Sequence, residues 1–205
     1  MREGFGKTAW TLTELCTLFR EEAQRVGAVV QEAGNWEDAF RYIIELAKAR
    51  GVSLVAISQS SLPHYQELVQ RLAQEGIQAV LPGEAPAQGL RRALTEAGMG
   101  ISGADLGIAE SGTLVLVRGD GRDRLVTALP PLHVALFSAH QLVHTLADAM
   151  VILKGWGDGY PPAHISLITG PSRTADIETA LVIGVHGPKE VHILILKERE
   201  GKEED

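Results

Sequence analysis

Apolar and polar residues follow helical and strand periods along the first half of the chain. Four segments carry apolar residues at every third or fourth position, which is the spacing of an amphipathic helix. They span residues 11–26, 36–50, 63–75 and 88–97. Short apolar runs at 28–30, 54–57 and 78–81 predict buried strands between the helices. This alternation of strand and helix favours a largely parallel sheet with helices on both faces.

Local signals mark the ends of these predicted helices. Thr11 and Glu14 are spaced as in a capping box, and Asn35 is a favoured N-cap residue. Gly27, Gly51 and Gly76 each follow the last apolar position of a helix, where glycine commonly ends one. The helix boundaries in this half are therefore predicted from two independent patterns.

Beyond residue 100 glycine becomes frequent and the predicted elements become shorter. Strands are expected at 113–117, 133–137, 164–169 and 191–196. Helices are expected at 139–154, with Ser138 as cap, and at 176–182. Turns are expected at 118–124, 170–174 and 184–188, and a loop at 155–163. A hairpin around the turn at 118–124 would make the sheet mixed.

These elements predict an α/β fold, a three-layer α/β/α sandwich with a mostly parallel mixed sheet. We expect one domain over residues 1–205, with flexible ends at 1–10 and 197–205. The 45% hydrophobic and 22% charged fractions are those of an ordinary globular protein. No apolar run reaches the roughly 18 residues of a membrane span, and the first ten residues lack a signal-peptide centre, so a cytoplasmic location is expected.

Composition also limits the chemistry that this chain can carry alone. Cys16 is the only cysteine, which excludes an intrachain disulfide, and iron–sulfur clusters normally take about four thiolates. The net charge of −7 without a basic, aromatic-rich segment argues against nucleic acid as a partner. The fingerprints of nucleoside triphosphate, dinucleotide and nucleophile-elbow sites are absent as well. We therefore predict no cofactor within this chain, and the sequence leaves a homodimer open.

The segment from 169 to 178 has the residues of an anion-binding turn. It follows a predicted strand and opens a predicted helix, so backbone N–H groups, hydroxyls and Arg173 could converge on a phosphate or carboxylate. The candidate binding residues here are Gly170, Ser172, Arg173, Thr174 and Asp176. The alternative is a structural cap and turn, in which Arg173 pairs with an acid of the same segment.

A second candidate segment, 103–113, places glycines around acidic and hydroxyl side chains. Glu110 is the best candidate for an acid, base or nucleophile, and Ser111, Gly112 and Thr113 are candidate binding residues beside it. The alternative is a solvated carboxylate next to a β-bulge.

Histidines supply the remaining candidates. His186 lies in the turn 184–188 and His133 follows two prolines, so each occupies a strand or loop end, although a structural histidine fits both positions equally well. His140 and His144 have the spacing of two ligands on one helical face. Because no third ligand is identifiable, we predict no metal site.

Four motifs taken together resemble the lactate utilisation protein C family, whose small members carry an LUD domain. They are GIAESGT at 107–113, LPPLH at 129–133, GPSRTADIE at 170–178 and GVHGP at 184–188. The resemblance is specific over 100–196, whereas the first half agrees only in the order of its elements. It implies a fold similar to the sugar-phosphate isomerase and CoA-transferase superfamily, a part in bacterial oxidation of L-lactate to pyruvate, and iron–sulfur partner proteins.

Two functions of different classes follow. The first is a non-redox component of a lactate-oxidising system, which binds a small carboxylate or organises iron–sulfur partners, with Arg173 gripping the anion and Glu110 or His186 handling a proton. The second is a stand-alone enzyme acting on an acyl-CoA or phosphorylated small molecule, with Glu110 as nucleophile or base. A pure scaffold, whose glycines only build tight turns, is the third alternative.

Overall fold

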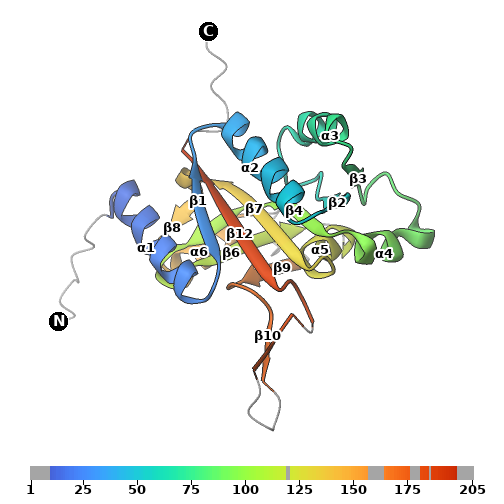
Figure 1. Ribbon diagram of the computed structural model, residues 1–205. Coiled ribbons are helices and arrows are strands. Elements are labelled where there is room, and N and C mark those ends of the chain that lie inside the picture. Colours follow the sequence, from blue (N-terminus) through green and yellow to red (C-terminus); the bar gives the residue numbers. More distant parts are fainter. Residues whose placement is uncertain (1–9, 119–120, 157–163, 176–180, 185, 198–205) are drawn as a thin grey trace, which may run out of the picture.

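A computed structural model describes residues 10–118, 121–156, 164–175, 181–184 and 186–197. Within these residues, six strands form an entirely parallel sheet in the order β1-β12-β7-β4-β2-β3 (Figure 1). They are β1 (Val29–Ala33), β12 (Glu190–Leu196), β7 (Leu132–Ser138), β4 (Met99–Gly103), β2 (Leu54–Ile57) and β3 (Gln78–Val80). The predicted α/β fold is confirmed.

The helices of the first half begin and end within two residues of their predicted bounds. They are α1 (Leu12–Arg25), α2 (Trp36–Ala49), α3 (Tyr65–Gln74) and α4 (Ala87–Glu96). The Thr11 hydroxyl and the Glu14 carboxylate form the predicted capping box at α1, and Asn35 Oδ1 accepts the Asp38 N–H at α2. Gly27, Gly51 and Gly76 have left-handed backbone directly after their helices, as expected for C-terminal glycines.

Helices α2 and α3 cover one face of the parallel sheet. Phe40 and Ile43 of α2, with Leu68 and Leu72 of α3, are fully buried against alternate residues of the central strands. Each such side chain contributes roughly 1.5–3 kcal/mol to folding. This face therefore holds the largest apolar cluster of the described residues.

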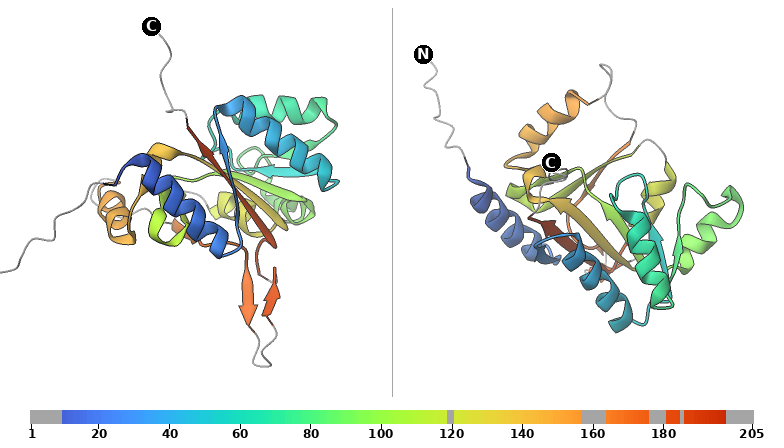
Figure 2. Two further views of the ribbon diagram at one scale, coloured as in Figure 1. Left: turned by 60° about the vertical axis from the view of Figure 1, so that its left-hand side comes forward. Right: turned by 90° about the horizontal axis from the view of Figure 1, so that it is seen from above.

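The opposite face is covered by α1, by a second sheet, and by α4 with α5 (Gly121–Ala128) (Figure 2). The second sheet has the order β8-β5-β6-β9, and its β5–β6 and β6–β9 pairs are antiparallel. Its strands are β5 (Leu106–Ile108), β6 (Thr113–Arg118), β8 (Leu142–Val143) and β9 (His164–Ile168). The antiparallel pairs therefore lie apart from the main sheet.

The turn predicted at 118–124 is wrong over 121–124, because α5 begins at Gly121. Val126 of this helix is buried, and its carbonyl oxygen would lie 2.0 Å from a Cβ at Gly100 of β4. The glycine in β4 thus lets the helix backbone approach the sheet. Tertiary packing stabilises this eight-residue helix, which is too short to be stable by itself and contains residues of low helix propensity at Gly121, Asp123, Val126 and Thr127.

The long helix predicted at 139–154 is also wrong in its first half. Ser138 caps only a 3-10 turn, η2 (Ala139–Gln141), and the chain then pairs with β5 as β8. Gln141 Nε2 donates to the carbonyl oxygens of Ala104 and Asp105, which ties this turn to the β4–β5 connection. A second capping box at Thr145 starts the true helix, α6 (Leu146–Lys154).

The helix predicted at 176–182 is contradicted at its end, where β11 (Leu181–Ile183) pairs antiparallel with β10 (Arg173–Ala175). These strands form an arm that extends away from both sheets (Figure 1). Apolar, β-branched residues such as those of β11 favour a strand over a helix. Residues 176–180 lie outside the described residues, as do all but Trp10 and Lys197 of the predicted flexible ends 1–10 and 197–205, and most of the predicted loop at 155–163.

Candidate functional site

Glu110 lies in the 3-10 turn η1 (Ala109–Ser111), between β5 and β6, and its side chain is exposed. Its Oε1 accepts the backbone N–H of Leu146 at 2.8 Å, and its own N–H donates to the His144 carbonyl oxygen at 3.0 Å. The carboxylate therefore satisfies a free donor at the start of α6, where the helix dipole favours a negative charge. This contact agrees with a structural role.

Glu110→Ala is expected to destabilise the protein by about 1 kcal/mol, the usual cost of a lost helix cap, while leaving ligand binding unchanged. Urea unfolding and calorimetric titration would measure the two effects. Glu110→Gln keeps an acceptor oxygen and should recover most of the stability. Loss of binding or turnover in a stably folded Glu110→Gln variant would instead establish chemistry at this carboxylate.

Gly112 serves the packing of η1 against α1. Its φ of 60° is left-handed, and a Cβ here would lie 2.2 Å from the backbone nitrogen of Ala23. Next to it, three hydroxyls form a chain in which Ser111 Oγ and Thr113 Oγ1 are 2.8 Å apart and Thr113 Oγ1 and Thr169 Oγ1 are 2.8 Å apart. The two candidate segments, 103–113 and 169–178, are thus joined through these hydroxyls.

The turns at 170–174 and 184–188 also meet. The Ser172 N–H donates to the Pro188 carbonyl oxygen and the Gly184 N–H donates to the Ser172 carbonyl oxygen, both at 2.9 Å. Arg173 is exposed, and its guanidinium donates to the Val26 carbonyl oxygen at 2.6 Å, beside the end of α1. The turn leads into strand β10 at Arg173–Ala175, and residues 176–180, where the predicted helix begins, lie outside the described residues.

The other predicted residues of these turns have different surroundings. Gly170 has a φ of 75°, and a Cβ there would lie 2.7 Å from the Val26 carbonyl oxygen. Thr174 pairs with Val182 in the arm, His186 is exposed, and Asp176 lies outside the described residues. The anion-binding roles of these residues stay predictions.

The histidine candidates separate clearly by burial. His133 is fully buried on β7, with its Nε2 2.9 Å from Ser102 Oγ of β4. His140 lies in η2 and His144 follows β8, where its ring stacks on Trp10 at 4.3 Å, so the predicted shared helical face is wrong. Among the described residues, no group of three or more histidine, cysteine or acidic side chains is placed to hold a metal ion.

The topology indicates a different position for a ligand. In parallel α/β sheets ligands bind outside the carboxyl ends of neighbouring strands whose connections leave to opposite faces. Strands β2 and β4 are such neighbours, because β2 continues to α3 on one face and β4 continues to the second sheet on the other. A cleft of about 370 Å³ lies beside this point, lined by residues 59–66.

A hydroxyl network holds the loop that lines this cleft. Ser58 Oγ and Ser61 Oγ are 2.7 Å apart, and Ser61 Oγ accepts the Gly103 N–H from the end of β4 at 3.1 Å. Ser60 Oγ donates to the buried Asp123 of α5. The loop is therefore bonded to both β4 and α5, and these bonds hold the lining of the cleft in a preformed shape.

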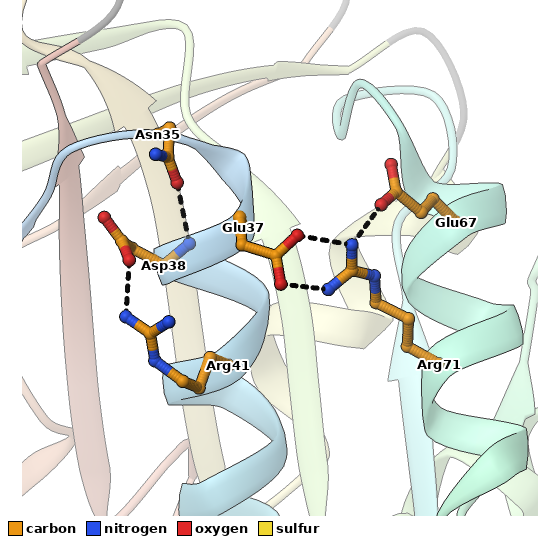
Figure 3. A network of polar contacts seen from close by, with 6 residues as sticks. All are labelled: Asn35, Glu37, Asp38, Arg41, Glu67 and Arg71. Atoms are coloured by element: carbon orange, nitrogen blue, oxygen red, sulfur yellow. Dashed lines mark hydrogen bonds and ion pairs between the residues drawn. The ribbon is translucent and has the colours of Figure 1, made fainter.

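An ionic contact fixes the helices beside the cleft (Figure 3). Arg71 of α3 donates to both carboxylate oxygens of Glu37 on α2, at 2.8 and 2.6 Å, and to Glu67 Oε1 at 2.6 Å. The Arg71 guanidinium holds the pKa of Glu37 below its usual value. At the same corner the ring of His64, which lines the cleft, lies 5.2 Å from that of Trp36 at the start of α2.

The sequence analysis did not identify the serines of this loop. Their signal is a polar stretch, Ser58-Gln-Ser-Ser61, placed directly after the buried run 54–57. Such a stretch at the end of a parallel strand indicates a binding loop, but only the strand order shows that β2 has β4 as its neighbour.

The fold defines a parallel α/β protein with a cleft at the carboxyl edge of its main sheet. The model of the LUD domain matches residues 16–196, and the chain therefore belongs to the LUD domain family. The match extends well before residue 100, where the sequence resemblance was no longer specific.

Relatives of known sequence are consistent with this membership. The chain is 31% identical over 162 residues to the uncharacterized protein NMB1437 of Neisseria meningitidis, covering 79% of this chain and 67% of that protein. It is 38% identical over 109 residues to a lactate utilization protein C of Geobacillus sp. and 39% identical over 106 residues to that of Halalkalibacterium halodurans. Each of these two alignments covers 51% of this chain but only 44% and 46% of the respective relative.

A solved structure supports the fold. The crystal structure of a DUF162 family protein from Deinococcus radiodurans superposes with a TM-score of 0.58 at 18% identity, covering 92% of this chain and 99% of that chain. Within the described part of the present chain, no helix has both the length and the apolar character needed to cross a membrane.

Proposed function

We propose that this chain is a non-redox component of a bacterial system that oxidises L-lactate to pyruvate. The observation that carries the proposal is the 36–39% identity to proteins named lactate utilization protein C. Because the alignments cover only 44% and 46% of the two lactate utilization proteins C, the activity of those whole proteins is itself part of the proposal.

The single cysteine determines which share this chain takes. L-lactate oxidation releases two electrons, and Cys16 alone cannot supply the thiolates of an iron–sulfur cluster. The electrons are therefore proposed to pass to a partner, and iron–sulfur proteins are the proposed partners.

The alternative of a stand-alone enzyme with Glu110 as nucleophile has weaker support. Attack by this carboxylate would compete with the bond from the Leu146 N–H, and the cleft at 59–66 is lined by other residues. The geometry of Glu110 thus favours the first proposal.

The ligand of the component is proposed to be a small carboxylate held in the cleft at 59–66. Tyr65 and Gln66 add a phenol and an amide to the lining, and these groups suit the hydroxyl and carboxylate oxygens of a 2-hydroxy acid.

The turn that contains Arg173 is the alternative binding site for the anion, and variants at both sites distinguish the two. We expect Tyr65→Phe with Gln66→Ala to weaken L-lactate binding about tenfold in calorimetric titration, and Arg173→Ala to leave it unchanged. The reverse result would place the anion at Arg173.

The pathway role is tested by anaerobic purification of the tagged full-length chain from its source bacterium. L-lactate-dependent dye reduction is expected in an eluate that contains iron–sulfur proteins, and is not expected from the isolated chain. Purification of the chain alone with an inactive eluate would contradict a stable assembly. Normal growth on L-lactate after deletion of the gene, with no duplicate present, would contradict the role itself.

A further inference from the structure

Helix α6 is apolar on the side that faces solvent as well as on the side that faces the protein. Its Ala149 and Leu153 are buried against the second sheet. On the outward side, Ala147, Met150 and Val151 follow the i, i+3, i+4 spacing of one apolar stripe, in which Met150 is 42% exposed and Val151 75% exposed, and Lys154 follows at i+7. A helix that is apolar on opposite sides is normally covered on both.

Strand β9 extends this surface. Ile165 and Leu167 pair with Val117 and Val115 of β6, so their side chains lie on the sheet face that α6 partly covers. They are 37% and 48% exposed. The outer apolar patch, as we name it, consists of Leu146, Met150, Val151, Ile152, Ile165 and Leu167.

The charges at the two ends of α6 are complementary to each other. Glu110 lies at the N-terminal end, bonded to the Leu146 N–H, and Lys154 is exposed at the C-terminal end. If a second copy were turned by a two-fold axis near Met150 and Val151, each Lys154 would approach the other copy's Glu110. The two helix dipoles would then run antiparallel, which is also favourable.

We propose that the outer apolar patch is the interface of a homodimer in which α6 packs antiparallel against α6 of a second copy. The apolar stripe supplies the centre of the interface and the ion pairs form its rim, which is the usual arrangement of protein interfaces. This proposal does not depend on the role in lactate oxidation.

Sedimentation equilibrium of the full chain between about 1 and 100 µM tests the interface. We expect a dimer whose dissociation constant rises at least about 30-fold in Val151→Lys, because a charge is placed at the centre of an apolar contact. Val29→Lys is the matched control, since Val29 is 41% exposed but lies on β1, outside the patch, and it should not change dimerisation.

A charge-exchange series provides the second measurement. Lys154→Glu and Glu110→Lys should each weaken the dimer, and the double exchange should restore much of the lost affinity. If the two substitutions acted only by disturbing the structure of α6, their effects on the dissociation constant would add instead. A chain that is monomeric at about 100 µM, or a dimer that Val151→Lys leaves intact, would overturn the proposal. A monomer that uses this patch for an iron–sulfur partner would overturn it as well.

Discussion

Gly112→Ala is expected to lower the free energy of unfolding by about 3 kcal/mol. Two causes add at this position. The left-handed backbone at φ 60° is costly for any residue with a Cβ, and that Cβ would lie 2.2 Å from the Ala23 nitrogen and 2.4 Å from its Cα. Both atoms belong to the backbone of α1, so the whole helix would have to shift.

Gly76→Ala separates these two causes. Gly76 also has a left-handed backbone, at φ 74°, but nothing lies within 4 Å of a Cβ there. Urea unfolding of both variants should show a loss of about 1 kcal/mol for Gly76→Ala and about three times as much for Gly112→Ala. Equal losses of stability in the two variants would mean that α1 does not pack closely against η1, and that packing does not account for the glycine at position 112.

Gly103→Ala is expected to reduce stability by about 2–3 kcal/mol and also to abolish measurable binding in the cleft at 59–66. A Cβ at Gly103 would lie 1.8 Å from the carbonyl oxygen of Ser61. The loop after β2 would have to move away from β4, which breaks the bond from the Gly103 N–H to Ser61 Oγ. Stability and ligand binding should therefore fall together.

Gly98→Ala is the control for this second variant. Its Cβ would approach Cγ2 of Val52 at 2.9 Å, a side chain that can rotate, and the site is at the opposite end of β4. Calorimetric titration should show normal ligand binding in Gly98→Ala with a smaller loss of stability. If Gly103→Ala folds and binds normally, the cleft is not the ligand site.

Much of the first half of the fold could be predicted because its signals are local. Thr11 with Glu14 and Asn35 cap their helices within one turn of sequence, and β2 has the bounds of the apolar run 54–57. Each of these signals depends on residues at most four positions apart. No distant contact is needed to interpret them.

The errors in the second half arise where distant contacts outweigh local preference. The segment 138–154 contains two capping signals, at Ser138 and Thr145, and only the pairing of β8 with β5 decides that the first helical segment ends after one turn. Similarly, α5 depends on the glycine at position 100, more than twenty residues earlier in the chain.

The candidate site was harder to predict than the fold for a related reason. Glycines that approach a ligand and glycines that approach another helix have the same sequence pattern, and Gly112 lies against α1. Glu110 was singled out for the same glycine-rich surroundings, but its described contacts are with α6 and His144. The serines at 58–61 match no short motif, so only the strand order draws attention to them.

The position of β12 between β1 and β7 has a consequence for the synthesis of this protein. Strand β1 is complete at Ala33, but its parallel partner begins only at Glu190. During translation the first strand therefore waits until the residues between Ala33 and Glu190 have emerged from the ribosome, with its edge open to other strands. We expect nascent chains stalled before β12 to recruit holding chaperones, and released full-length chains to close the sheet in one late step.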